Sequence, residues 1–244
     1  MTEIGAELSG PPAPAGGWRR ATVRSVERPH PNSVRLLLDV PDRVDHLSGQ
    51  HYVVRLRADD GYTAQRSYSI ASAPHEPGIE LFVDKLPDGE VSGFLADVVL
   101  PGDELEVRGP IGGWFVWRGA TPAVAVGGGS GVVPLVSMLR HARHIGRPDL
   151  LQLAVSARTY EELPYGVELI QGGAIVALTR GDDIAVSRSA GRLTAADVLP
   201  LITPDATAFI CGSARFSDGA SVLLMEAGLP ATAIRVERFG PTGS

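Results

Sequence analysis

Cysteine is almost absent from this sequence, since Cys211 is the only one among 244 residues. A single cysteine cannot form an intramolecular disulfide bond. A cysteine-ligated iron–sulfur cluster or a structural zinc site needs several thiolates, so we expect no metal site. Because disulfides belong to oxidising compartments, the cytoplasm is the default location.

Long apolar runs are absent as well. No run reaches the roughly 18 residues that a membrane-spanning helix needs, so we expect no transmembrane segment. The N-terminal stretch MTEIGAELSGPPAPAGGW has neither a basic start nor an apolar core, and it does not resemble a signal peptide. Its proline, glycine and alanine content predicts a disordered tail over residues 1–17.

Basic residues are few, and nearly all of them are arginine. The formal net charge of −6 argues against nucleic-acid binding, because that function needs a basic surface. Lys85 is the only lysine. A coding preference for arginine would explain this without any function. The alternative is that some arginines bind phosphates through two parallel hydrogen bonds, which lysine makes less well.

Residues 18–118 have the pattern of an all-β domain, in which short apolar runs alternate with turn sequences such as RPHPNS and LPGD. The candidate strands are 18–27, 33–40, 50–57, 64–71, 78–86 and 103–110. A helix is expected at 90–99, with one apolar face made of Val91, Phe94, Leu95 and Val98. We predict an antiparallel β-barrel of about six strands plus this short helix.

Residues 119–244 alternate between buried strands and amphipathic helices. The candidate strands are 123–128, 150–157, 174–180, 206–213 and 233–239. The candidate helices are 132–146, 160–171, 194–202 and 218–229, and Pro164 could bend or split the second of them. This alternation predicts an α/β nucleotide-binding domain, with a parallel sheet covered by helices on both faces.

The first of these strands leads into the sequence GGGSG at residues 127–131. Glycines allow a ligand to approach the backbone, and the following helix would offer free amides and a positive dipole end. This combination suits a pyrophosphate. The loop lacks the Gly-Lys-Ser/Thr of a Walker motif, and Pro134 stands where a G-x-G-x-x-G motif has its last glycine. A tight turn without a ligand is the alternative.

Polar residues follow the next strands at the carboxyl edge of the sheet, where ligands bind in such folds. Ser156 and Arg158 follow one strand, and Thr179 and Arg180 follow another, with Arg188 just beyond. Arginines at this edge favour the 2′-phosphate of NADPH, whereas an acidic residue would favour the ribose of NADH. Each arginine taken alone is also compatible with a solvated surface role.

Cys211 and Gly212 end the fourth strand at the same edge. A lone cysteine is ordinarily a small buried apolar residue. Its position before a glycine, in line with the glycine loop, makes it a candidate for the site as well.

One candidate strand carries an unusual polar run, RSYS, at residues 66–69. Strand alternation would put Arg66 and Tyr68 on one face and Ser69 on the other. For Tyr68 and Ser69 to reach one ligand, the strand must bend or end at this point. We therefore interpret these residues as a binding site rather than as a defective core strand.

Together these motifs resemble the ferredoxin–NADP reductase superfamily of flavoproteins, over nearly all of residues 18–239. The resemblance is carried, in chain order, by RSYS at 66–69, a Gly-x-x-Ser segment at 89–92, GDELEVRGPIGGWF at 102–115, GGGSGVVP at 127–134 and CGS at 211–213. It implies an FAD-binding domain at 18–118 and an NAD(P)-binding domain at 119–244.

The resemblance also implies roles for residues of the first domain. Arg66 would pair with the FAD pyrophosphate, Tyr68 would stack on the isoalloxazine ring, and the Ser69 hydroxyl would bond near flavin N5. The pyrophosphate would also contact the start of the following helix, at Gly89, Val91 and Ser92.

For the second domain the resemblance implies NADPH, with NADH as an alternative coenzyme. The pyrophosphate would lie against Gly128, Gly129, Ser130 and Gly131. The 2′-phosphate would be surrounded by Ser156, Arg158, Thr179 and Arg180. Cys211 and Gly212 would lie near nicotinamide C4.

The last strand would return to the flavin. Glu237 and Phe239 would shield the ring or assist proton transfer there, although Phe239 is equally compatible with a core position. The catalytic set implied by the resemblance is Ser69, Cys211 and Glu237. The segment GPTGS follows Phe239, whereas many relatives end at an aromatic residue.

The implied activity is hydride transfer from NADPH to FAD, followed by electron transfer to a separate protein such as a ferredoxin or an oxygenase component. We expect a monomer. One alternative is a flavin reductase that releases reduced free flavin. A second alternative, from a different class, is a nucleotide-sensing module without catalysis.

Overall fold

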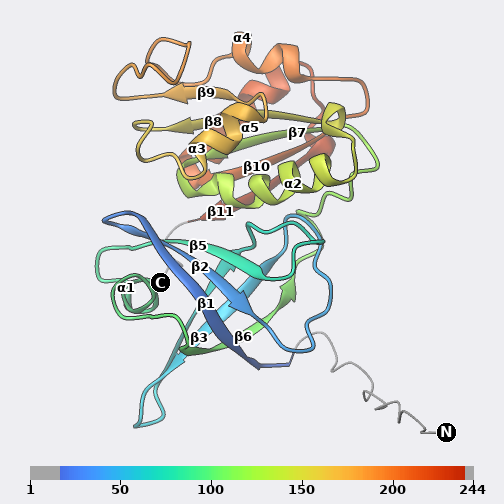
Figure 1. Cartoon of the computed structure of the whole chain (residues 1–244). Coiled ribbons are helices and arrows are strands. Elements are labelled where there is room, and N and C mark those ends of the chain that lie inside the picture. The colour runs from blue at the N-terminus through green and yellow to red at the C-terminus, as the bar shows by residue number, and fades with distance from the viewer. Residues whose placement is uncertain (1–16, 240–244) are drawn as a thin grey trace, which may run out of the picture.

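The computed structural model describes residues 17–239 of the chain. Residues 1–16, which hold most of the predicted tail, and residues 240–244, which form the segment after Phe239, lie outside the described part. The described residues form an antiparallel sheet followed by a parallel sheet, stacked as two domains (Figure 1).

The antiparallel sheet confirms the predicted β-domain, and its six strands pair in the order β4-β3-β6-β1-β2-β5. They are β1 (Arg19–His30), β2 (Ser33–Asp39), β3 (His51–Arg57), β4 (Thr63–Ser69), β5 (Ile79–Asp84) and β6 (Glu104–Ile111). Alternate side chains, such as Val34, Leu36 and Leu38, are fully buried inside the curved sheet. A bridge between Ile70 and Leu81 joins the two outer strands, so the sheet curls into a barrel.

Helix α1 (Glu90–Asp97) packs on the barrel, but its buried face differs from the predicted one. Val91 and Leu95 are buried as expected, whereas Phe94 is 37% and Val98 54% exposed. The helix is rotated so that Ser92 faces inward, because the Ser92 hydroxyl is hydrogen-bonded inside the preceding turn. A local polar contact thus outweighed the apolar periodicity of a short helix.

The parallel sheet confirms the predicted second domain, and its strands pair in the order β11-β10-β7-β8-β9. They are β7 (Ala123–Gly128), β8 (Leu151–Ala157), β9 (Ile175–Leu178), β10 (Thr207–Ser213) and β11 (Ile234–Phe239). Its helices are α2 (Val133–His144), α3 (Gly166–Gln171), α4 (Ala195–Val198) and α5 (Ala214–Glu226). Short 3₁₀ turns occupy η1 (Gly129–Val132), η2 (Pro148–Leu150), η3 (Leu199–Leu201) and η4 (Ala231–Ala233). Helix α2 lies between this sheet and the barrel (Figure 1).

Two helices, α3 and α5, begin several residues away from their predicted starts. The helix predicted at 160–171 begins only at Gly166, because Pro164 has no amide hydrogen and Tyr165 adopts a left-handed backbone with φ 57°. Helix α5 begins at Ala214, before the predicted start, because the Ser213 side chain caps it by accepting a hydrogen bond from the Phe216 amide at 3.3 Å.

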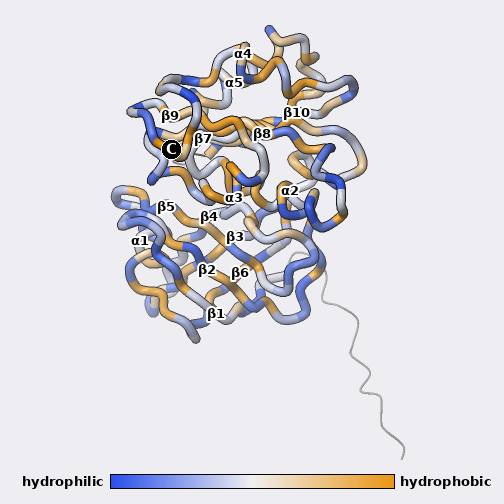
Figure 2. Tube along the Cα trace, turned by 45° about the horizontal axis from the view of Figure 1, so that its top comes forward, coloured by the Kyte–Doolittle hydropathy of each residue, from blue (hydrophilic) through white to orange (hydrophobic). Residues whose placement is uncertain are grey.

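Apolar residues follow the strands of both sheets, and polar residues follow the connections (Figure 2). One apolar cluster fills the barrel, and one lies on each face of the parallel sheet. A small further cluster of Ala71, Phe82 and Val133 lies where the domains meet. Within residues 17–239, no helix combines the length and apolar character that a membrane crossing requires.

Candidate functional site

The end of strand β4 carries the first group of predicted site residues. Arg66 and Tyr68 lie opposite Val54 and Tyr52 of β3. Directly opposed residues of antiparallel strands point to the same face. Since Val54 and Tyr52 are fully buried, Arg66 and Tyr68 share the inward face of β4. The strand ends at Ser69, as the polar run predicts.

The Tyr68 phenol oxygen is buried and has no hydrogen-bond partner among residues 17–239. Burial raises the pKa of this phenol well above its usual value, and the charge of Arg66 opposes that rise only in part. The Arg66 guanidinium is exposed and donates to the carbonyl oxygen of Gln65 at 2.7 Å. An unpaired buried hydroxyl is destabilising, which is consistent with a ligand that supplies its partner.

The start of helix α1 holds the residues of the Gly-x-x-Ser segment. Gly89 is the N-cap residue, and Val91 lies in the first turn, where backbone amides lack partners within the helix. The Ser92 hydroxyl accepts from the Leu86 amide at 3.1 Å and donates to the Gly89 carbonyl at 3.3 Å. This hydroxyl is therefore used within the chain, contrary to its expected role as a donor to a ligand. The backbone amides are what the helix start offers.

The glycine loop follows β7 and forms the turn η1 before α2 begins. A Cβ atom on Gly131 would lie 2.1 Å from the carbonyl oxygen of Cys211, and one on Gly128 would lie 2.7 Å from the Phe216 ring. Gly131 lets the loop pack closely on β10, and Gly128 lets it pack closely on the first turn of α5. Gly129 has φ +56° and no atom within 4 Å of a Cβ position, so its surface is open. Pro134 lies in the first turn of α2, where its missing amide hydrogen has no consequence.

Arg158 and Arg180 lie next to each other at the carboxyl edge of the parallel sheet. The Arg180 amide donates to the Arg158 carbonyl at 2.9 Å, so the two exposed side chains start from neighbouring strand ends. Arg158 makes a loose ion pair with Glu162 at 3.8 Å. Ser156 is buried, and the Thr179 hydroxyl donates to the Ala157 carbonyl at 3.3 Å. Thr179 and both arginines are exposed, whereas Ser156 is not.

Arg188 does not share this surface role. It makes two hydrogen bonds with the Asp197 carboxylate, at 3.0 and 3.1 Å, and donates to the carbonyl oxygens of Gly191 and Arg192. Asp197 also forms the capping box of α4 with Thr194. Arg188 therefore holds the loop before α4 in place.

Cys211 lies between Gly127 and Glu237 in the register of the parallel sheet. Its side chain is fully buried, and burial together with the charge of Glu237 raises the pKa of the thiol well above its usual value. Burial raises the pKa of the Glu237 carboxyl to about 7. A neutral thiol thus lies beside a carboxyl group that titrates near neutrality. Phe239 is half-buried and packs against the same apolar cluster.

Sequence reasoning missed Asp84, at the end of β5. The Ser130 hydroxyl donates a hydrogen bond to its carboxylate, which joins the glycine loop to the barrel domain. Although Asp84 is exposed as a residue, desolvation of its carboxyl by the neighbouring domain raises the pKa in spite of that hydrogen bond. Nothing in the local sequence could reveal the contact, because the two residues belong to different domains.

Residues 21–116 match the family described as the oxidoreductase FAD-binding domain. Over both domains the chain is similar to a ferredoxin NADP⁺ reductase from Neisseria gonorrhoeae, with a TM-score of 0.78 at 19% identity, covering 91% of this chain and 98% of that chain. The fold is that of the ferredoxin–NADP reductases. The FAD/NAD-binding domain of nitric oxide dioxygenase from Vibrio cholerae has it too, with a TM-score of 0.80 at 22% identity, covering 91% of this chain and 99% of that chain.

Two curated proteins that are similar in sequence to this chain are named as a reductase component and a reductase subunit. The propane 2-monooxygenase reductase component of Rhodococcus jostii is 30% identical over 85% of this chain and 59% of its own length. The glycine betaine monooxygenase reductase subunit of Chromohalobacter salexigens is 31% identical over 80% of this chain and 56% of its own length. The chain thus spans somewhat more than half the length of these relatives.

The residues present fit an FAD group. The buried Tyr68 hydroxyl lacks a partner, and the exposed Arg66 guanidinium stands on the same face of β4. A ligand with polar and anionic atoms would satisfy both groups. Arg66, Tyr68 and Ser69 would hold it, together with the amides at the start of α1.

Proposed function

We propose that this protein is an FAD-dependent NAD(P)H oxidoreductase that passes electrons to a separate acceptor protein, such as a ferredoxin or an oxygenase component. The observation that carries the proposal is the unpartnered Tyr68 hydroxyl beside Arg66, within the match to an FAD-binding domain. The names of the curated relatives, which are reductase components of monooxygenases, support the acceptor class.

FAD, when bound, would supply the redox chemistry by taking a hydride from the nicotinamide and releasing electrons to the acceptor. The chain's own part is binding and orientation. Arg66 would neutralise the pyrophosphate, and Tyr68 would bury one face of the flavin ring while its hydroxyl gains a partner. Ser69, at the strand end, would meet the edge of the ring.

On the side of the coenzyme, the open surface of Gly129 and the amides before α2 would receive the pyrophosphate. The buried Cys211 thiol and the Glu237 carboxyl lie at the neighbouring strand ends. Glu237 can hold or release a proton near neutral pH, because burial raises its pKa to about 7. This supports a role for Glu237 as a proton donor at the edge where the two cofactors would meet.

We further propose that NADPH is the preferred coenzyme. Arg158 and Arg180 are exposed and start from adjacent strand ends. Two guanidinium groups at this edge suit a 2′-phosphate.

The purified protein tests this function directly. We expect it to carry yellow FAD, and we expect anaerobic NADPH to bleach the flavin absorbance, with slower bleaching by NADH. A colourless protein that turns over added free flavin would point to a flavin reductase instead. A protein whose bound flavin stays oxidised with both coenzymes would support a sensing module and refute the proposal.

A further inference from the structure

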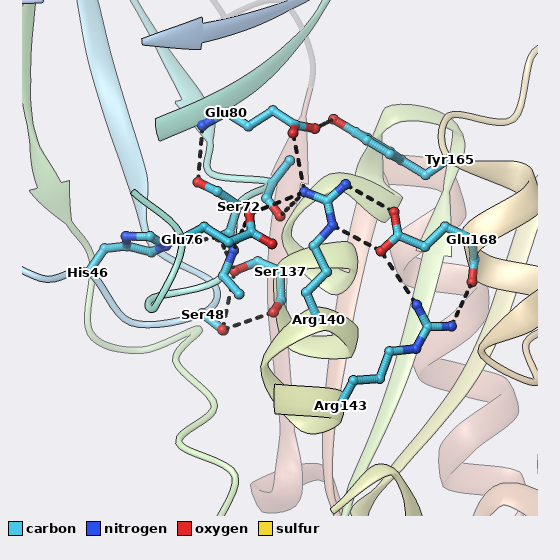
Figure 3. Close-up of polar contacts among 12 residues, drawn as sticks. His46, Ser48, Ser72, Glu76, Glu80, Ser137, Arg140, Arg143, Tyr165 and Glu168 are labelled. Atoms are coloured by element: carbon cyan, nitrogen blue, oxygen red, sulfur yellow. Dashed lines mark hydrogen bonds and ion pairs between the residues drawn. The ribbon is translucent and has the colours of Figure 1, made fainter. Parts of the chain in front are cut away.

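Arg140 is the centre of a polar network between the two domains (Figure 3). It belongs to α2, and its side chain is 15% exposed. Its guanidinium makes two parallel hydrogen bonds with the Glu168 carboxylate of α3, at 2.9 and 3.0 Å. This bidentate pair fixes the orientation of the guanidinium within its own domain.

The remaining nitrogen of Arg140 reaches the barrel domain. Its Nη1 atom lies 3.3 Å from the Glu80 carboxylate of β5 and 3.3 Å from the Ala71 carbonyl oxygen. The Glu76 carboxylate lies 3.6 Å away. The Tyr165 hydroxyl donates to the other carboxylate oxygen of Glu80 at 2.6 Å. The second domain therefore holds Glu80 through two groups, as Figure 3 shows.

Ser137, one turn earlier on α2, makes a second crossing contact. Its hydroxyl donates to the Ser72 carbonyl at 2.8 Å, and the Ser48 hydroxyl donates to the Ser137 carbonyl at 3.1 Å. His46 Nε2 bonds the same Ser72 carbonyl at 2.9 Å. Because the three serines are buried, water does not compete for these hydrogen bonds.

This network joins the two candidate cofactor sites through short, stiff connections. Residues 71–72 follow Ser69 closely, at the end of the flavin-binding strand. Arg140 lies on the helix that begins at Val133, directly after the glycine loop. At a rise of about 1.5 Å per residue, Arg140 is about 10 Å along the helix from that start. A shift of Arg140 would therefore move one site relative to the other.

We propose that Arg140 is a positioning residue that sets the separation between nicotinamide and flavin, acting through Glu80 and Ala71. This inference rests on the proposed function. Displacing reacting groups by about 1 Å can lower a rate about 100-fold. Without the guanidinium, the carboxylates of Glu76, Glu80 and Glu168 would face one another with their central cation removed. Their repulsion would then act across the domain boundary.

The test compares Arg140→Met with Arg143→Met. Arg143 is the matched control, because it lies on the same helix and bonds Glu168 of its own domain, at 3.6 and 3.3 Å. FAD-loaded proteins are mixed anaerobically with saturating NADPH, either unlabelled or deuterated at C4. We expect Arg140→Met to slow flavin reduction about 10- to 100-fold, with the isotope effect retained and the NADPH dissociation constant changed by less than about threefold. Arg143→Met should stay within about threefold of wild type in rate.

A second readout uses the flavin-free protein and needs no turnover. The Ala71 amide donates to the Glu80 backbone carbonyl at 2.8 Å. The hydrogen-exchange rate of this amide therefore reports on the part of the barrel that Arg140 contacts. Exchange should accelerate in Arg140→Met and not in Arg143→Met. Glu80→Gln serves as the test if Arg140→Met does not fold. It keeps the shape of the side chain but removes the charge that pairs with Arg140, and it should slow flavin reduction by about 3- to 10-fold.

The outcomes distinguish failure of the positioning role from failure of the proposed function. If Arg140→Met reduced flavin at the wild-type rate, the positioning role would be overturned. Glu80→Gln gives the same test where Arg140→Met does not fold. An equal loss of flavin-reduction rate in Arg143→Met would also overturn the role. A wild-type protein whose flavin is not reduced by either coenzyme would refute the proposed function, and the positioning role with it. Slower reduction in Arg140→Met with intact coenzyme binding and faster Ala71 exchange would establish the role.

Discussion

Replacing Gly131 by alanine tests how closely the glycine loop fits the sheet. The added Cβ atom would lie 2.1 Å from the Cys211 carbonyl oxygen and 2.7 Å from the Gly212 Cα, whereas ordinary contact begins at 3.4 Å. The loop and β10 would therefore have to separate by about 1 Å. Since β10 is paired with β7 on one side and β11 on the other, the loop and the start of α2 must move.

The magnitude follows from this displacement. Overpacking of this kind costs about 1–3 kcal/mol, which for a chain of this length lowers Tm by about 2–12 °C. The backbone amides proposed to bind the NADPH pyrophosphate would move with the loop, so kcat/KM for NADPH should fall by up to about 100-fold. Thermal unfolding followed by circular dichroism measures the first effect, and steady-state kinetics measures the second.

Gly219→Ala is the matched control for this prediction. Gly219 is exposed on α5, and a Cβ atom there meets no atom within 4 Å. This variant should be stabilised by about 0.5–1 kcal/mol, because alanine favours the helix more than glycine does. If Gly131→Ala matched wild type in both Tm and kcat/KM, the close fit of loop and strand would have no consequence and the reasoning would be refuted.

Three further predictions concern the cofactor sites. Tyr68→Phe removes the unpartnered hydroxyl, so the free energy of unfolding of the flavin-free protein in urea should rise by about 1–3 kcal/mol. FAD binding should weaken, and an unchanged FAD affinity would count against contact between this hydroxyl and FAD. Arg158→Ala combined with Arg180→Ala should raise KM for NADPH and leave KM for NADH nearly unchanged, and equal effects would remove the coenzyme preference. The pKa of Glu237 is raised from 4.5 to about 7, so between these pH values the folded state keeps a proton that the unfolded state releases. The free energy of unfolding should therefore fall as pH rises from 4.5 towards 7. Glu237→Gln should abolish that fall in urea unfolding across this pH range, and an unaltered pH dependence would contradict it.

The polar run of β4 shows what local sequence can predict. Arg66 and Tyr68 were expected to share a face, and the register with Val54 and Tyr52 agrees. The strand was expected to bend or end near Ser69, and it ends there. These features follow from the period-two geometry of strands, which needs no knowledge of the partner strand. The ligand roles of these residues remain predictions.

Helix α1 and Arg188 show where local pattern is insufficient. Apolar spacing placed Phe94 on the buried face, but the Ser92 hydroxyl turned the helix so that Phe94 is 37% exposed. Arg188 had the sequence position of a phosphate ligand, yet Asp197 holds it in a loop. Side-chain hydrogen bonds decided both cases, and such bonds leave no periodic trace in sequence.

The sequence by itself determined the two domain types, the order of their strands along the chain and the positions of the glycine and arginine motifs. Those depend on hydrophobic period and on glycine and proline, which act over a few residues. Only the tertiary structure decided that Arg140 meets Ala71, Glu80 and Glu168, which lie 69, 60 and 28 residues away along the chain. Electrostatic pairing and burial between domains depend on distance in space, so the contacts between the two candidate cofactor sites could not be predicted from the sequence.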